Sequence, residues 1–113
     1  MNKISQGEIW YANLNPTKAS EQAGHRPVLV VSGNMLNTNL EIVIVMPLTS
    51  KIKNYKGNIV LKPNKSNGLE CTSEVLIFHI RSLSKERLTK QIGKVSKSEL
   101  DGLKNGLNDI LRY

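Results

Sequence analysis

Cysteine is nearly absent from this sequence, because Cys71 is the only one among 113 residues. A single cysteine excludes an intrachain disulfide framework and a cysteine-based zinc cluster. The chain has no apolar run approaching the roughly 20 residues that a membrane-spanning helix needs. Its first residues carry no apolar segment typical of a secretory signal. We therefore expect a cytoplasmic protein that does not enter a membrane.

Several motifs of metal-dependent and nucleotide-binding enzymes are also missing. The sequence has no P-loop, no glycine-rich dinucleotide fingerprint, no H-E-x-x-H pair and no serine nucleophile elbow. Carboxylates do not cluster at metal-ligand spacing, and the only histidines are His25 and His79. We therefore expect no metal and no cofactor, so that any acid–base chemistry has to work without them.

Acidic residues are outnumbered in this chain. Nine Asp and Glu stand against sixteen Lys and Arg, which gives a formal net charge of +7. A basic domain of this size suits a polyanionic partner, because contacts with phosphates release counterions. The same positive field also favours an acidic polypeptide. The charge therefore indicates a nucleic acid or an acidic protein as the partner, without choosing between them.

Short apolar runs bounded by Gly, Pro and polar residues predict one β-rich domain over residues 1–113. The clearest run covers residues 27–31, and its continuous apolar character predicts a strand that is buried on both faces. We expect strands over residues 8–12, 27–31, 41–46, 57–61, 73–80 and 90–95.

The C-terminal stretch follows a helical period. Ser96 and Glu99 have the spacing of a capping box, which satisfies the amide groups at a helix start. One apolar face follows at helical spacing: Leu100, Leu103, Leu107, Ile110 and Leu111. Gly102 and Gly106 each weaken such a helix by about 1 kcal/mol relative to Ala, so we expect packing on the sheet to hold it. With a short helical turn over residues 84–88, the predicted architecture is mostly β (α+β), a compact barrel with a C-terminal helix.

A long polar connection, residues 13–26, separates the first two strands, and such loops are usually functional or disordered. It holds Glu21, His25 and Arg26 within six residues. RNA cleavage through the neighbouring 2′-OH needs a base, a cation for the charged phosphorane and an acid for the leaving oxygen. Glu21 or His25 could be the base and Arg26 the cation, with Thr49 as a hydroxyl donor. The alternative is an ordinary solvated ion pair on a surface loop.

Three segments in order resemble the signature motifs of MazF/PemK-type toxins of type II toxin–antitoxin systems: residues 16–30, 45–50 and 75–83. The similarity extends over essentially the whole chain. It implies an SH3-like barrel of the MazF/CcdB toxin type that forms a homodimer. It also implies a metal-independent endoribonuclease (an mRNA interferase) that cleaves single-stranded RNA at specific sequences. Attack by the 2′-OH would leave 2′,3′-cyclic phosphate and 5′-hydroxyl ends.

The resemblance further implies roles for individual residues. The catalytic arginine of the family falls on Arg26, its catalytic threonine or serine on Thr49, and the glutamate of the first loop on Glu21. The implied partner is a MazE-like antitoxin, whose flexible acidic tail would occupy the RNA groove. We expect RNA contacts from polar residues in and beside these motifs: Ser20, Gln22, His25, Ser50, Lys51, Lys53, Lys56, His79 and Arg81.

Two departures from the family pattern leave alternatives open. His79 stands where many members have Gln, and it is either a second acid–base candidate or a half-buried strand histidine. Leu76 and Phe78 stand where some members carry a catalytic Arg and Asp, which favours the mechanism based on Arg26 and Thr49. The competing functions are a CcdB-like gyrase poison on the same fold and a non-catalytic member that binds RNA or antitoxin.

Overall fold

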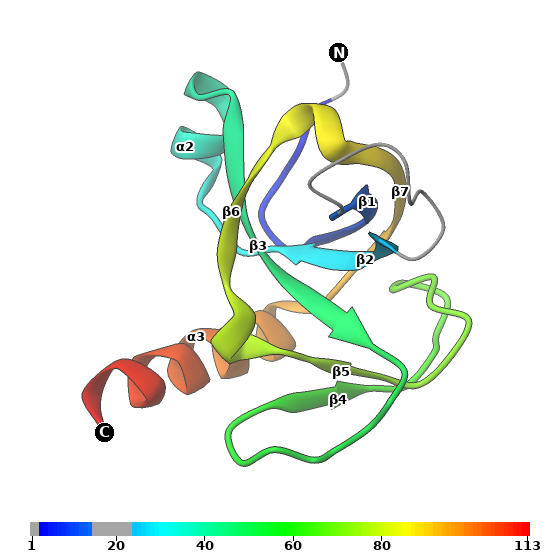
Figure 1. The fold of residues 1–113 in the computed structure, drawn as a ribbon, viewed down its shortest axis with the longest axis vertical. Coiled ribbons are helices and arrows are strands. Elements are labelled where there is room, and N and C mark those ends of the chain that lie inside the picture. Colours follow the sequence, from blue (N-terminus) through cyan, green and yellow to red (C-terminus); the bar gives the residue numbers. More distant parts are fainter. Residues whose placement is uncertain (1–2, 15–23) are drawn as a thin grey trace.

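The computed structural model describes residues 3–14 and 24–113. Within them the chain forms a mostly antiparallel sheet with one long C-terminal helix (Figure 1). The strands are β1 (Glu8–Asn13), β2 (His25–Val30), β3 (Ile42–Thr49), β4 (Ile59–Leu61), β5 (Ser73–Val75), β6 (Arg81–Ser84) and β7 (Leu88–Lys94). The helices are α2 (Asn34–Asn39) and α3 (Lys97–Arg112), together with the 3-10 turns η1 (Ile77–His79) and η2 (Lys85–Arg87).

Strand β3 organises the sheet, because both of its edges are paired. One edge pairs with β2, β2 pairs with β1, and β1 pairs with β7. The other edge of β3 pairs first with β6, where Val43 lies opposite Leu83, and then with β5, where Leu48 lies opposite Val75. The sheet therefore curls into a half-barrel with α3 below it (Figure 1). This confirms the predicted fold class.

Two hydrophobic clusters lie on the two faces of the curled sheet. Side chains alternate along a strand. Ile9 and Leu29 therefore belong to the cluster between the sheet and α3, which includes Leu103, whereas Trp10 and Val28 belong to the cluster on the other face of the sheet. Both faces of β2 are therefore covered, as its continuous apolar run predicts. The indole of Trp10 is only 5% exposed, and its Nε1 donates a hydrogen bond to Glu8 Oε1 at 3.0 Å.

Helix α3 begins at the predicted capping box. Ser96 Oγ accepts a hydrogen bond from Glu99 N at 3.0 Å, and Glu99 Oε1 accepts one from Ser96 N at 2.8 Å. Gly106 lets the helix approach the loop between β3 and β4, since a Cβ there would lie 2.8 Å from Gly57 O. The last turn is not covered by the described residues, because Leu111 is 76% exposed. Packing on the sheet therefore holds the first turns of the helix but not its end.

One predicted element is wrong. Residues 73–80 do not form a single strand but divide into β5, η1 and the approach to β6. His79 N donates to Leu76 O at 3.1 Å and Ile80 N donates to Ile77 O at 3.1 Å, and these turn bonds interrupt the extended backbone. The interruption lets one chain segment pair twice with the same edge of β3. His79 is accordingly exposed on η1 and is not a half-buried strand histidine.

The other predicted strands are present with shifted ends, and the short turn predicted over residues 84–88 is η2. Helix α2 was not predicted, because its sequence NMLNTN has no helical apolar period and it lacks a side-chain cap. Its Asn37 is buried, and its Nδ2 donates to Ser32 O at 2.9 Å. Among residues 3–14 and 24–113, no helix is long and apolar enough to span a membrane.

Candidate active site

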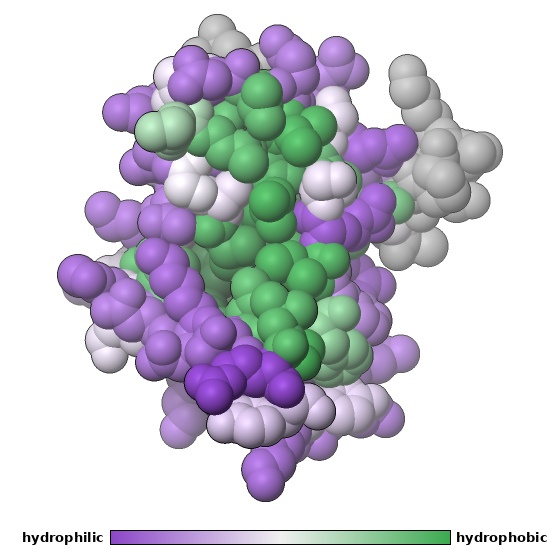
Figure 2. Space-filling model, turned by 90° about the vertical axis from the view of Figure 1, so that its left-hand side faces the viewer, coloured by the Kyte–Doolittle hydropathy of each residue, from purple (hydrophilic) through white to green (hydrophobic). Residues whose placement is uncertain are grey.

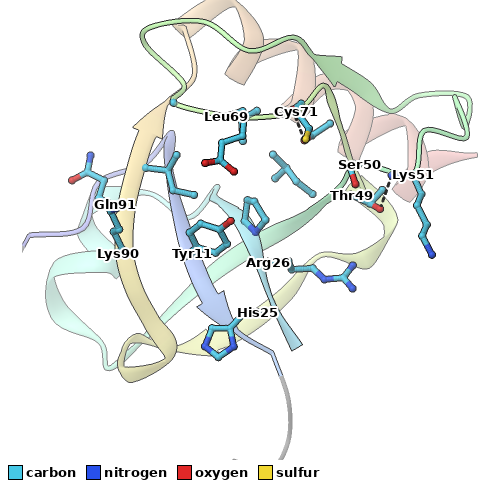
Figure 3. Close-up of a pocket in the computed structure, with 16 residues that line it drawn as sticks. Tyr11, His25, Arg26, Thr49, Ser50, Lys51, Leu69, Cys71, Lys90 and Gln91 are labelled. Atoms are coloured by element: carbon cyan, nitrogen blue, oxygen red, sulfur yellow. Dashed lines mark hydrogen bonds between the residues drawn. The ribbon is translucent and has the colours of Figure 1, made fainter. Parts of the chain in front are cut away.

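A groove of about 570 Å³ lies where β1, β2 and the end of β3 face β7 and the β4–β5 loop (residues 62–72). Figure 3 shows that Arg26, Thr49, Ser50 and Lys51 gather at one end of it. Tyr11, Lys90 and Gln91 lie on the opposite side, on β1 and β7. The two segments that sequence analysis singled out, 25–26 and 49–51, therefore meet in one site although they are far apart in the sequence.

Arg26 is fixed by the strand that carries it. Its neighbour Pro27 has no backbone N–H and favours an extended conformation in the residue before it, and Arg26 lies opposite Ala12 in the β1–β2 register. The strand then enters the core at Val28, which is fully buried. The partly buried Arg26 side chain extends toward the side on which Thr49 and Lys51 lie (Figure 3). A guanidinium on so rigid a base can hold a phosphate in one orientation.

Thr49 ends β3, and its hydroxyl is oriented by the turn that follows. Thr49 Oγ1 accepts a hydrogen bond from Lys51 N at 3.1 Å. Its backbone lies opposite Glu74 in the β3–β5 register. Since the hydroxyl uses an acceptor position in this turn, its proton is available to an oxygen in the groove.

The charged residues that line the groove are mostly cations. Among the residues that the structure describes, they are Arg26, Lys51, Lys90 and Glu70, three positive charges against one negative. His25 also lines the groove and is exposed. A concave site with this balance attracts a polyanion.

The side of the groove that β1 and β7 form was not predicted from the sequence. Tyr11 is 38% exposed, while its neighbours Trp10 and Ala12 are buried. It lies opposite Pro27 on one side and Lys90 on the other. The alternation in β1 could have indicated that Tyr11 points away from the inner core, but the pairing of β1 with β7 had no signal in the sequence.

The structure does not bring every predicted RNA-binding residue into this groove. Lys53, Lys56, His79 and Arg81 are exposed but do not line it. Lys53 and Lys56 lie on the β3–β4 loop (residues 50–58), His79 on η1 and Arg81 on β6. The predicted catalytic Glu21 and the predicted RNA contacts Ser20 and Gln22 lie outside the described residues.

A buried carboxylate that sequence analysis also missed fixes the β3–β4 loop. Glu74 is 0% exposed, and its two carboxylate oxygens accept hydrogen bonds from the backbone N–H groups of Lys53, Asn54 and Tyr55 at 2.7, 3.0 and 2.9 Å. Asn58 Nδ2 donates a fourth at 3.0 Å. Burial alone would raise the pKa of Glu74, but these hydrogen bonds outweigh it and hold the pKa below its ordinary value.

The donor set of the described residues does not define a metal site. Within residues 3–14 and 24–113, no group of three or more His, Cys, Asp or Glu side chains lies close enough to hold an ion. The groove is instead lined by a guanidinium, hydroxyls and ammonium groups, and these are hydrogen-bond donors that can bind a phosphate.

Comparison with known proteins assigns the chain to a family. The family described as "PemK-like, MazF-like toxin of type II toxin-antitoxin system" matches residues 5–111. The chain therefore belongs to this family of toxins, and the resemblance drawn from its sequence motifs is confirmed.

The similar proteins include endoribonucleases of known identity. The chain is 35% identical over 109 residues to endoribonuclease MazF9 of Mycobacterium tuberculosis, covering 92% of each chain. It is 31% identical over 105 residues to endoribonuclease EndoA of Bacillus subtilis, covering 92% of this chain and 90% of the other. The crystal structure of MazF from Deinococcus radiodurans superposes with a TM-score of 0.81 at 27% identity and covers 100% of both chains. A MazE–MazF structure from the same organism superposes with a TM-score of 0.79 at 25% identity, over 99% of this chain and 98% of that chain.

Proposed function

We propose that this toxin is an endoribonuclease that cleaves single-stranded RNA at short sequences without a metal ion. The observation that carries the proposal is the meeting of Arg26 and Thr49 in one cationic groove. Similarity to proteins named as endoribonucleases supports it. A gyrase poison would not need a guanidinium and a hydroxyl in one cationic groove.

The reaction requires the 2′-oxygen to attack the neighbouring phosphorus while the bond to the 5′-oxygen breaks. A base removes the 2′-OH proton, and the departing 5′-oxygen gains a proton, so the products are a 2′,3′-cyclic phosphate and a 5′-hydroxyl end. Charge accumulates on the phosphorane oxygens, and preorganised donors stabilise it most where water is excluded. Arg26 supplies the charge and Thr49 Oγ1 supplies a hydroxyl donor. Since the nucleophile belongs to the substrate, the reaction needs no metal-bound hydroxide.

The general base is Glu21 in this proposal, with His25 as the alternative. His25 lines the groove, and an imidazole is the commonest general base in enzymes. A pH–rate profile of the two variants Glu21→Gln and His25→Gln distinguishes them, because loss of the base removes the limb of the profile that the base produces.

We also propose that the toxin is a homodimer. Figure 2 shows a continuous apolar band down the face on which Figure 1 places α2 and the end of α3. Exposed apolar side chains on these elements and on the start of β3 include Met35 at 82%, Ile42 at 37%, Ile110 at 39% and Leu111 at 76%. A contiguous apolar surface on a small protein marks an association site.

The antitoxin is the second proposed partner. The similar MazE–MazF structure from D. radiodurans supports a MazE-like antitoxin for this chain. An acidic flexible tail would bind the cationic groove for the same electrostatic reason as RNA does, and would thereby exclude the substrate.

The test is cleavage of a long single-stranded RNA in excess EDTA, with the cut ends mapped by primer extension. We expect cuts at one recurring short sequence. Arg26→Ala and Thr49→Val should remain folded and lose activity, while Lys104→Ala, an exposed site on α3, should cut like the wild type. No cleavage by folded wild-type protein on an RNA that contains every short motif would overturn the proposal.

A further inference from the structure

An exposed aromatic cluster lies outside the groove. The Tyr55 and Phe78 rings are 5.2 Å apart at 87°, and the Phe78 and His79 rings are 4.7 Å apart at 84°. Tyr55 is 49% exposed and Phe78 is 46% exposed. Phe78 is the only phenylalanine of the chain, and the core does not use it. Large aromatic side chains are ordinarily core or interface residues, so their position at the surface points to a ligand.

The two segments that carry these rings are tied together by buried polar contacts. Glu74 accepts the backbone N–H of Tyr55 at 2.9 Å and Asn58 Nδ2 at 3.0 Å. The same Asn58 accepts a hydrogen bond from Ile77 N through its Oδ1 at 3.2 Å. Ile77 immediately precedes Phe78 on η1. One carboxylate and one amide therefore set the position of the Tyr55 backbone relative to the turn that carries Phe78 and His79.

Backbone hydrogen bonds hold the β3–β4 loop in one conformation. Asn54 has φ of 54° and is the only non-glycine residue with positive φ among the described residues. Asn tolerates this left-handed region better than most residues. Three consecutive N–H groups, from Lys53 to Tyr55, converge on Glu74 as a result. A rigid loop loses little conformational entropy when a ligand binds to it.

The surroundings of the cluster favour RNA as the ligand. Lys53 and Lys56 flank Tyr55 in the loop, and both are exposed. The loop starts at Ser50 and Lys51 in the groove, so it connects the groove to Tyr55. Unpaired bases stack on exposed aromatic side chains while nearby cations contact the backbone. A second copy of this chain would bring the same lysines against each other, whereas the exposed aliphatic residues Met35, Ile42 and Leu111 suit that role better.

We propose that Tyr55, Phe78 and His79 form a stacking site for an unpaired base of the RNA, outside the cleavage groove, and that buried Glu74 is the residue that positions it. This rests on the proposed function, because it assigns part of the recognition of the same RNA to the β3–β4 loop. The ring that stacks is a binding element, and Glu74 acts only through the loop. The site would add affinity for longer RNA without taking part in bond cleavage.

The first test separates binding from chemistry by substrate length. Tyr55→Leu and Phe78→Leu keep an apolar side chain and remove the ring, Tyr55→Phe keeps the ring, and Tyr113→Leu changes an exposed tyrosine at the end of α3. On a long RNA we expect KM to rise about tenfold for the two ring-removing variants, equivalent to about 1.4 kcal/mol, with kcat unchanged. Tyr55→Phe and Tyr113→Leu should behave as the wild type, and all variants should be alike on an RNA trimmed to the bases at the cut.

The second test measures stacking without cleavage. RNA with 2-aminopurine at successive positions, and a 2′-deoxy nucleotide at the cut to block attack, should show quenched fluorescence at one position outside the cut. Tyr55→Leu, Phe78→Leu and Glu74→Gln should restore the fluorescence. Unchanged KM on long RNA, no quenched position, or a shift of Tyr55→Leu and Phe78→Leu from dimer to monomer would each overturn the inference. A wild type that quenches but does not cut would instead refute the proposed function alone.

Discussion

Replacing Glu74 by glutamine removes a buried charge while keeping the shape of the side chain. The carboxylate accepts four hydrogen bonds from N–H donors. The amide of glutamine has one acceptor oxygen, and its NH₂ group would face donors instead of acceptors. Hydrogen bonds to a charged group are worth about 1.5–3 kcal/mol each. With two of them lost, and with a smaller desolvation cost in return, we expect a loss of about 2–4 kcal/mol in the free energy of unfolding.

The effect should depend on pH in a defined direction. The hydrogen bonds hold the pKa of Glu74 below its ordinary value of 4.5. A carboxyl with a lowered folded-state pKa stabilises the protein fully above its unfolded pKa, and that stability is lost as the pH falls through the folded pKa. The difference between wild type and Glu74→Gln should therefore be constant from pH 7 to pH 5 and become smaller below about pH 4.5.

Urea unfolding followed by circular dichroism at several pH values measures this difference. Glu86→Gln, at an exposed site on η2, is the matched control and should change stability by less than about 0.5 kcal/mol. At neutral pH the melting temperature of Glu74→Gln should fall by roughly 10 °C. A variant as stable as wild type at pH 7, or a difference that grows below pH 4.5, would refute the account of Glu74 as an ionised anchor of the loop.

Three further predictions follow from the site, the helix and the apolar face. Thr49→Val should lower kcat by about a hundredfold or more with little change in KM, because it removes a donor that acts in the transition state; an equal loss in binding measured with uncleavable RNA would contradict this role. Gly106→Ala should destabilise the protein despite its better helix propensity, because a Cβ would meet Gly57 O and Ile77 Cδ1 at 2.8 Å; a higher melting temperature would show that the loop moves freely. Leu111→Lys should shift the toxin from dimer to monomer in sedimentation velocity, and an unchanged dimer would place the interface elsewhere.

The sequence predicted those parts of the fold whose signals are local. The apolar run at residues 27–31, the strand over residues 8–12 and the capping box at Ser96 each depend on neighbouring residues, and the structure confirms them. Residues 73–80 have the composition of one strand, and only their double pairing with β3 requires the turn at η1. Periodicity carries no information about which distant edge a segment will meet.

The candidate site, too, was predicted only where short sequence motifs mark its residues. Family motifs placed Arg26 and Thr49, and the curled sheet brings them together in the groove. The β4–β5 loop could not be predicted, because it is shaped by nonlocal contacts: Gly68 has φ of 66° and, like Gly93, leaves no room for a side chain where this loop meets β7. Glu74 had no signal either, since an acidic residue inside an apolar run does not reveal which backbone amides will surround it.

The order of the strands determines when the groove can form during synthesis of the chain. Tyr11 of β1 lies opposite Lys90 of β7, so opposite ends of the domain form one wall of the groove. A ribosome adds residues one at a time, at about 5–20 per second, and a nascent chain that ends before β7 has neither that wall nor the partner strand of β1. The groove can close only after nearly the whole domain has been made, so an incomplete translation product lacks a complete site. The long-range pairing of β1 with β7 thereby makes completion of the groove depend on synthesis of the chain through Lys94.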